Sequence, residues 1–586
     1  MKTAPSCSMA KTNGSSLVRT QNGRFTDLDH DKLRGGYYTS HELAAWLCTW
    51  AIRTTNDRVL EPSCGDGAFL VSAVERFVEL GAPVLAIAEN LTGIEIVAAE
   101  ADRARARLRE RYGLRAHNFV ETSDFFSWWQ RSDRPTFDAV IGNPPFIRYQ
   151  SFPEPHRSRA MQIMAELGLR ANRLTNIWVP FVVAAASSLR PGGRLALVLP
   201  AELLQVTYAA QLRSFLTDRF SRIDIVTCNE LFFDKAEQEV ILLLADGALS
   251  AASESNSCRV TLTEAHTMIE IVERQPEVVL ADAQPKTVHH DQEKWLKYFL
   301  TEREIAFMRE LRSSAVSTTL ATHASVDVGV VTGKNEFFVL NKEQITKLRL
   351  NSYTTPLVSR SVHLKGARIK KTDWEALAAA GDRVHLLHLA PLNGSKPDEP
   401  LANYIRSGEN NAIHKGFKCS VRTPWYAVPS VWIPDGFVFR QIYDFPRMVL
   451  NQAKVTSTDT IHRLTCKAKP EHVIANTYTY LTAASAEIEG RSYGGGVLEL
   501  EPTEAERLLM PAKLATALPL DECDRMTRAG DLDDVLAENS RLVLMDAMGL
   551  SRSECTLLRN IWTKMRDRRL ARSRRGRVLM GAEAVS

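Results

Sequence analysis

The sequence has no long apolar run, no signal peptide and no paired cysteines. Its 586 residues contain no stretch of about 18 apolar residues that could span a membrane. The polar N-terminus, MKTAPSCSMAKTNGSS, has no apolar signal-peptide core. The nine cysteines are scattered and form no Cys-x-x-Cys pair, so we expect no zinc site. These absences predict a cytoplasmic protein with reduced thiols, no membrane contact and no metal.

A phosphate-binding loop and a strong net charge are also missing. No Gly-x-x-x-x-Gly-Lys-Ser/Thr motif follows a strand pattern, so a P-loop nucleotide hydrolase is not supported. The formal net charge of +4 permits a nucleic-acid partner but does not require one. One local run is different, because Arg566–Arg577 carries seven arginines. That run is either a solvated tail or an arm that binds phosphates.

Hydrophobic patterning divides the chain into five segments. Residues 1–34 are polar without periodicity, which predicts a disordered tail. Strand and helix patterns alternate through residues 35–250, which predicts an α/β domain with a parallel, doubly wound, Rossmann-like sheet. We expect a linker at 251–300, an α+β domain at 301–510 and a helical segment at 511–586.

A glycine loop between a strand and a helix is the first candidate site. In VLEPSCGDGAFL, Gly65 and Gly67 allow a tight turn and the approach of a ligand to the backbone. Glu95 ends the next strand, where an acid can bind ribose hydroxyls, and Asp124 follows the third strand with Phe125 beside it. Each feature alone also fits a plain turn, a helix cap or a surface acid. Together they outline a nucleoside pocket at the carboxyl edge of the sheet.

The second candidate site is the exit from the strand in FDAVIGNPPFIRYQ. Asn143 lies at the carboxyl edge, and Pro144 and Pro145 stiffen the loop and remove two backbone donors. The Asn143 side-chain carbonyl and the Phe146 ring add an acceptor and a flat face. Such a cup can hold an amine on a planar ring. The alternative is an ordinary Asn-Pro turn after a strand.

Taken in order, these motifs resemble those of the gamma-class (Taq-type) S-adenosylmethionine-dependent N6-adenine DNA methyltransferases. The matching residues are EPSCGDG, IE, SDF and NPPF, with Phe146 in place of the commoner tyrosine. GGYYTSHELAAWL resembles the segment that closes over the cofactor, and LRPGGRLALVLPAELL and NELFFDKAEQEVILLLAD resemble later segments of the class. The resemblance covers about residues 35–246. More loosely, residues 301–510 are similar to the DNA target-recognition region of these enzymes.

The resemblance implies a Rossmann-like methyltransferase fold followed by a target-recognition domain and the helical C-terminal segment. It implies that a methyl group passes from S-adenosyl-L-methionine to the N6 amine of an adenine flipped out of duplex DNA. The implied catalytic residues are Asn143, Pro144, Pro145 and Phe146, with Phe146 and Phe232 stacking on the target base. The implied cofactor-binding residues are Tyr38, Thr39, Glu61, Pro62, Ser63, Cys64, Gly65, Gly67, Glu95, Asp124 and Phe125.

The resemblance also implies partners. These are double-stranded DNA and, as a candidate, a separate restriction endonuclease that acts on the same site, with the methyltransferase itself a monomer. In residues 301–510, basic side chains mixed with Trp425, Tyr426, His462 and Tyr493 are a plausible surface for reading DNA grooves. The alternative for each of them is the ordinary core or surface of an α+β domain.

Other functions stay open at this point. A glutamine methyltransferase or an rRNA methyltransferase can share the Asn-Pro-Pro-Phe loop, although the former is usually compact and here a long region follows residue 246. A DNA-binding module without catalysis would need neither the glycine loop nor the amine cup. No Pro-Cys dipeptide occurs, so the nucleophile of cytosine-carbon methyltransferases is absent.

Overall fold

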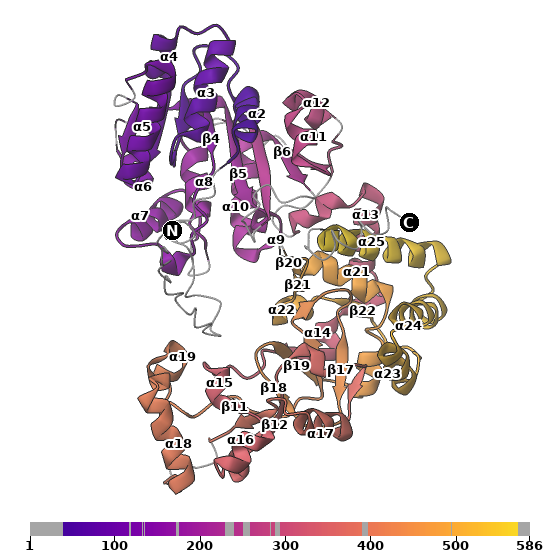
Figure 1. Ribbon diagram of the computed structural model, residues 1–586. Coiled ribbons are helices and arrows are strands. Elements are labelled where there is room, and N and C mark those ends of the chain that lie inside the picture. The colour runs from indigo at the N-terminus through magenta and orange to yellow at the C-terminus, as the bar shows by residue number, and fades with distance from the viewer. Residues whose placement is uncertain are drawn as a thin grey trace, which may run out of the picture.

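The computed structural model describes residues 39–115, 119–131, 133, 135–170, 175–228, 239–249, 258–281, 283–286, 293–389, 396–493 and 495–571. The chain forms two lobes (Figure 1), an N-terminal lobe around one large sheet and a C-terminal lobe around several small ones. In these ranges, no helix combines the length and the apolar character needed to cross a membrane.

The N-terminal lobe is built on an eight-stranded sheet of order β3-β2-β1-β4-β5-β7-β6-β8. The strands are β1 (Val59–Glu61), β2 (Leu91–Glu95), β3 (Val120–Thr122), β4 (Phe137–Gly142), β5 (Leu189–Pro200), β6 (Phe220–Cys228), β7 (Val240–Ala248) and β8 (Arg259–Ala265). The Rossmann-like prediction is confirmed, but the sheet is not fully parallel, because β7 runs antiparallel to both β5 and β6. The connection from β6 to β7 is too short for the helical crossover that parallel neighbours need.

Helices cover both faces of this sheet. They are α2 (His41–Ala51), α3 (Ala68–Glu79), α4 (Val84–Asn90), α5 (Ala98–Tyr112), α6 (Phe125–Trp129), α7 (His156–Glu166), α8 (Trp178–Ala186), α9 (Glu202–Gln205) and α10 (Ala210–Arg219). Side chains of α2, α3 and α5 form one buried core, and those of α6, α8 and α10 belong to another. Alternate residues of β5 point into the two cores: Leu195 and Leu197 into one, Ala196 and Val198 into the other. Strands buried on both faces explain why their sequences are continuous apolar runs.

Local sequence determines where these helices begin and end. Ser40 is the N-cap of α2, because its side chain accepts a hydrogen bond from the Leu43 amide at 3.3 Å. Helix α5 carries i,i+3 ion pairs such as Arg103–Glu100 and ends at Gly113, whose φ of 68° is left-handed.

The N-terminal lobe continues into the region where we expected a linker. Strand β8 pairs in parallel with β6, and α11 (Met268–Val272) and α12 (Pro276–Ala281) pack against α2. Residues 259–281 therefore belong to the eight-stranded sheet and its cover, and the expectation of a linker over 251–300 was wrong for them. The physical reason is that β6 would otherwise present an unpaired sheet edge.

The C-terminal lobe contains a five-stranded sheet of order β10-β19-β15-β17-β13 and a four-stranded sheet of order β11-β14-β12-β18. Its strands are β9 (Ser317–Thr319), β10 (Ala324–Asp327), β11 (Val339–Leu340), β12 (Thr354–Val358), β13 (Arg368–Ile369), β14 (His385–Leu387), β15 (Gly436–Phe439), β16 (Gln441–Ile442), β17 (Met448–Asn451), β18 (Thr456–Ser457), β19 (Ile461–Cys466), β20 (Arg491–Ser492), β21 (Leu498–Glu499) and β22 (Leu509–Pro511). His462 of β19 is fully buried and bonds the Leu500 carbonyl through Nε2 at 2.7 Å, so it is a core residue and not a groove-reading one.

The helices of this lobe surround the small sheets. They are α13 (Glu302–Ser313), α14 (Leu320–His323), α15 (Asn335–Phe338), α16 (Lys342–Lys347), α17 (Lys371–Ala379), α18 (Glu399–Asn410), α19 (Phe417–Ser420), α20 (Pro470–Ala475), α21 (Tyr480–Glu489), α22 (Pro502–Ala505), α23 (Leu520–Ala529), α24 (Leu532–Asn539) and α25 (Arg552–Ala571). Helices α15, α18 and α19 share a small hydrophobic core with β11 and β14, separate from the main one.

The arginine-rich run begins inside α25 and ties the two lobes together. Arg568 pairs with Glu264 of β8 at 2.5 Å and with Glu239 at 3.4 Å. Arg569 is buried and pairs with Glu487 of α21 at 2.6 Å. These arginines are therefore neither a solvated tail nor a phosphate-binding arm. Residues 572–577 of the run lie outside the described residues.

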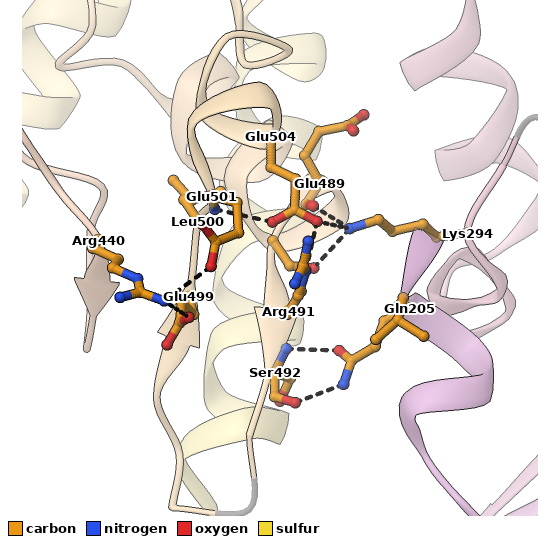
Figure 2. Close-up of polar contacts among 12 residues, drawn as sticks. Gln205, Lys294, Arg440, Glu489, Arg491, Ser492, Glu499, Leu500, Glu501 and Glu504 are labelled. Carbon is orange, nitrogen blue, oxygen red and sulfur yellow. Dashed lines mark hydrogen bonds and ion pairs between the residues drawn. The ribbon is translucent and has the colours of Figure 1, made fainter. Parts of the chain in front are cut away.

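A second polar joint connects the lobes near the end of β5 (Figure 2). The Gln205 side chain donates to the Ser492 carbonyl at 2.7 Å and accepts from the Ser492 amide at 2.6 Å. Lys294, in the segment after α12, reaches the Glu504 carboxylate at 3.0 Å, and Arg491 donates to the same oxygen at 2.9 Å. Because such buried polar groups must all be satisfied, the joint fixes how the lobes sit together.

Candidate functional site

The carboxyl ends of β1, β2 and β4 open into one cavity of about 380 Å³. Of the residues expected at a site, its wall contains Thr39, Glu61, Pro62, Ser63, Cys64, Gly65, Glu95, Asp124, Phe125, Asn143 and Pro145. The two motifs that we treated separately, the glycine loop and the Asn-Pro-Pro-Phe loop, therefore lie on one cavity. Tyr38 and Phe232 lie outside the described residues.

The glycine loop is held by the carboxylate of Glu95. Its two oxygens accept hydrogen bonds from the Gly65 amide at 2.9 Å and the Val97 amide at 2.8 Å. Gly65 and Gly67 have φ angles of 52° and 88°, which side chains other than glycine rarely adopt. A Cβ on Gly67 would lie 3.0 Å from Cβ of Ala104, so Gly67 contacts α5 and does not line the cavity.

Asp124 has both of the roles that the sequence left open. It is the N-cap of α6, where its Oδ2 accepts from the Ser127 amide at 3.0 Å, and it also lines the cavity. His156 and Arg159 of α7 lie 3.2 and 3.7 Å from the same oxygen. Phe125 stacks on Phe181 with centroids 5.3 Å apart and is almost fully buried, although it also lines the cavity.

The Asn-Pro-Pro-Phe loop starts where β4 ends. Gly142 leaves the strand with a φ of 145°, and a Cβ there would lie 3.4 Å from Cγ of Glu61. The Asn143 side-chain amide donates to the Thr39 hydroxyl at 3.3 Å, and the Ser63 hydroxyl donates to the Asn143 carbonyl at 3.4 Å. The loop is thus attached to both the glycine loop and the segment before α2.

Two residues of this loop stand apart from the cavity wall. Pro144 is absent from it, and Phe146 is half-buried and packs against both hydrophobic cores. The wall also contains Ile147, Phe152 and Phe181, which the sequence analysis missed. Their apolar patterns resemble those of any core residue, so the sequence offered no signal for them.

Glu61 is the most perturbed acid of the cavity. It is 2% exposed, and burial, followed by the charges of Glu95 and Asp66, raises its pKa well above the usual value. Its Oε2 has no hydrogen-bond partner among the described residues. Leaving a buried carboxyl oxygen unmatched is costly, so the cavity suits a ligand that brings a donor or a cation. The amino-acid end of S-adenosylmethionine carries such a group.

Comparisons with known proteins cover both lobes. Residues 88–233 match the Eco57I restriction-modification methylase family, and residues 292–544 match the C-terminal domain of Type II methyltransferase M.Eco57I. Type II methyltransferase M.AccI of Acinetobacter calcoaceticus is 22% identical and aligns over 82% of this chain and 86% of its own. Type II methyltransferase M.XamI of Xanthomonas campestris pv. amaranthicola is 20% identical and aligns over 86% of this chain and 90% of its own.

Among solved structures, the fold resembles that of the Type IIL restriction-modification enzyme MmeI in complex with DNA. The TM-score is 0.50 at 11% identity, with 90% of this chain and 75% of that chain covered, and this likeness concerns the fold alone. The sheet and the family matches define an S-adenosylmethionine-dependent methyltransferase of Rossmann-like fold. The resemblance to restriction-modification methyltransferases is confirmed, and the chain is related to their Type II members over both lobes.

Proposed function

We propose that this modification methyltransferase acts on the exocyclic N6 amine of adenine in duplex DNA, after the base has been flipped out of the helix. The observation that carries the proposal is that Asn143 and Pro145 share one cavity with Glu95 and the glycine loop. A stiff acceptor loop beside a nucleoside pocket is the arrangement that transfer to a planar amine requires. A base inside a duplex cannot reach such a cavity, so it must be extruded.

In this proposal the acceptors of the loop activate the amine. The lone pair of an aromatic amine is delocalised into the ring, which makes the nitrogen a poor nucleophile. The Asn143 side-chain oxygen and the Pro144 carbonyl would accept the two amine hydrogens and stabilise positive charge on the nitrogen as the methyl group arrives. The stacking of Phe146 and Phe232 on the extruded base is proposed from the resemblance alone, since Phe146 does not line the cavity and Phe232 lies outside the described residues.

The cofactor residues follow the cavity wall. S-adenosylmethionine supplies a methyl group already activated on a sulfonium, so the protein mainly aligns it with the amine. Glu61 would take the ammonium of the amino-acid part, Glu95 the ribose hydroxyls, and Asp124 with Phe125 the adenine. Thr39 and the segment Pro62–Gly65 would complete the cradle.

Methyl transfer from tritiated S-adenosylmethionine to plasmid DNA, followed by nucleoside analysis, tests the proposal. We expect label in N6-methyladenine with the wild-type protein. The Asn143→Ala variant should lose transfer and still bind the cofactor. Full activity in that variant would contradict the assignment, and label in RNA or in protein glutamine would replace it with one of the alternatives.

The partners belong to the same proposal. We propose that duplex DNA is bound by a monomer and that a separate endonuclease cleaves the same sequence when it is unmethylated. Size-exclusion chromatography with light scattering tests the monomer. Digestion of methylated and unmethylated plasmid with a candidate restriction endonuclease tests the partner: the cognate enzyme cuts only the unmethylated plasmid.

A further inference from the structure

Two apolar side chains are exposed to solvent beside the small core that α18 and α19 share with β11 and β14. α18 and α19 lie at the end of the C-terminal lobe opposite α24 and α25 (Figure 1). At this end Phe417 is 75% exposed and Val421 is 69% exposed. Phe417 is the first residue of α19, and Val421, four residues later, is the C-cap that follows the helix. No other aromatic side chain that the structure describes is as exposed as Phe417.

The exposed pair is held on a firmly anchored turn. Cys419, between the two residues, is buried in the small core. The Arg422 guanidinium donates to the carbonyls of Thr332 at 2.8 Å and Val331 at 2.6 Å. The backbone of this segment is therefore fixed, and the exposure of Phe417 is a property of the fold.

Close packing fixes the turn from the other side as well. Gly333 has a φ of 87°, and a Cβ there would lie 2.9 Å from Cβ of Lys418 and 3.2 Å from Sγ of Cys419. Only a glycine lets the two segments approach this closely. The turn cannot rotate to bury Phe417 without breaking these contacts.

In the sequence around Phe417 and Val421, every residue with a full charge is a cation. The ten residues Ile413–Arg422 contain Lys415, Lys418 and Arg422 and no acid. Both lysines are exposed, and the Lys418 ammonium lies 5.6 Å from the centroid of the Phe417 ring. An apolar side chain flanked by exposed cations fits a polyanion that also offers flat apolar surfaces, and duplex DNA has both.

We propose that this knob, defined by Phe417 and Val421 with Lys415 and Lys418, is a DNA-binding wedge. Phe417 enters the base stack beside the target base, with Val421 packed next to it, and the two lysines bind the flanking phosphates. The wedge thereby helps to open the duplex for the cavity of the N-terminal lobe. This inference rests on the proposed action on duplex DNA and adds the element that opens it.

Steady-state methylation of plasmid DNA tests the wedge. Phe417→Ala should lower kcat/KM for DNA by about 5- to 150-fold, the range for loss of one base–aromatic stack, and leave the KM for S-adenosylmethionine unchanged. Phe417→Tyr should keep most of the activity. Leu85→Ala, which truncates an 83% exposed side chain on α4, is the matched control and should behave as wild type. Because Phe417 is exposed, equal thermal unfolding of all variants checks that folding is intact.

A mismatched substrate separates a wedge from a simple contact. The methylated sequence is first identified by sequencing plasmid modified by the wild-type protein. A duplex with that site and a mispaired target adenine is already partly open, so it should restore most of the activity of Phe417→Ala. A Lys415→Gln, Lys418→Gln double variant should reduce the slope of log Kd against log salt by about 1 to 2.

The outcomes distinguish this inference from the proposed function. If wild type methylates DNA and Phe417→Ala equals it on paired DNA, the wedge is overturned while the function stands. If Phe417→Ala instead alters the oligomeric state in light scattering, the knob binds protein and the inference is also overturned. If wild type methylates no DNA, the proposed function itself fails.

Discussion

The orientation of the Asn143 amide gives the sharpest test of the site. Its nitrogen donates to the Thr39 hydroxyl at 3.3 Å, which directs the side-chain oxygen to the other side of the amide. Thr39 is 8% exposed and lines the cavity, so its hydroxyl holds the amide at the cavity wall. Thr39→Val keeps the shape and removes the acceptor. The amide would then lose this acceptor and would turn more readily to present a donor to the target amine.

The size of the effect follows from the geometry. A neutral hydrogen bond contributes about 0.5 to 1.5 kcal/mol, and one of 3.3 Å belongs near the middle of this range at most. A loss of about 1 kcal/mol corresponds to about a 5-fold lower rate of methyl transfer. We expect this loss in kcat and in single-turnover rates measured at saturating cofactor.

Single-turnover transfer of tritiated methyl groups measures the rate directly. Thr39→Ser keeps the hydroxyl and should retain most of the wild-type rate. The reasoning is refuted if Thr39→Val transfers methyl groups at the wild-type rate, or if Thr39→Ser is as slow as Thr39→Val. A loss confined to cofactor KM would assign Thr39 to cofactor binding alone.

Three further predictions concern charge and the joints between lobes. Because burial raises the pKa of Glu61, the folded protein keeps a proton that the unfolded chain releases above its ordinary pKa, so the free energy of unfolding should fall as pH rises from about 4.5 toward the raised pKa. Over the same pH range the affinity for the cofactor should rise, and calorimetry should detect proton release on binding. The Glu61→Gln variant should flatten both pH profiles. Arg569→Ala should lower the free energy of unfolding in urea by about 3 to 5 kcal/mol, because it leaves the Glu487 carboxylate buried without its cation. The Arg569→Met, Glu487→Met double variant should lower the free energy of unfolding by clearly less. Equal losses in the two variants would contradict a buried ion pair. Gln205→Ala removes two hydrogen bonds to Ser492 and should lower the rate of DNA methylation more than the affinity for the cofactor. Gln205→Glu keeps one acceptor, so its methylation rate should lie between those of the wild type and Gln205→Ala. A loss of cofactor affinity without a loss of methylation rate would contradict the joint between the lobes.

Features that depend on neighbouring residues in the chain could be predicted from the sequence. The strands around Val140 and Leu197 are continuous apolar runs, and the two candidate loops are contiguous motifs whose glycines and prolines restrict the backbone locally. The order of strands along the chain placed both loops at one sheet edge, and the structure puts them on one cavity.

Features that depend on contacts distant in sequence could not be predicted. The antiparallel direction of β7 and the place of β8 at the sheet edge come from pairing with β6. Asp124 caps a helix and lines the cavity at once, and its sequence context is the same for either role. We expected a linker where the structure has β8, because the sequence of this strand has little apolar pattern.

The sequence by itself determined the local form of the two candidate loops, because the Asn-Pro-Pro-Phe loop and the glycine loop are short segments whose conformations their own residues restrict. The tertiary structure decided which side chains are covered and which are free. It buried His462 and Arg569, whose residue types favour the surface, and it exposed Phe417, whose type favours the core. Burial is set by the whole set of neighbours that packs around a position, and those neighbours come from distant parts of the chain.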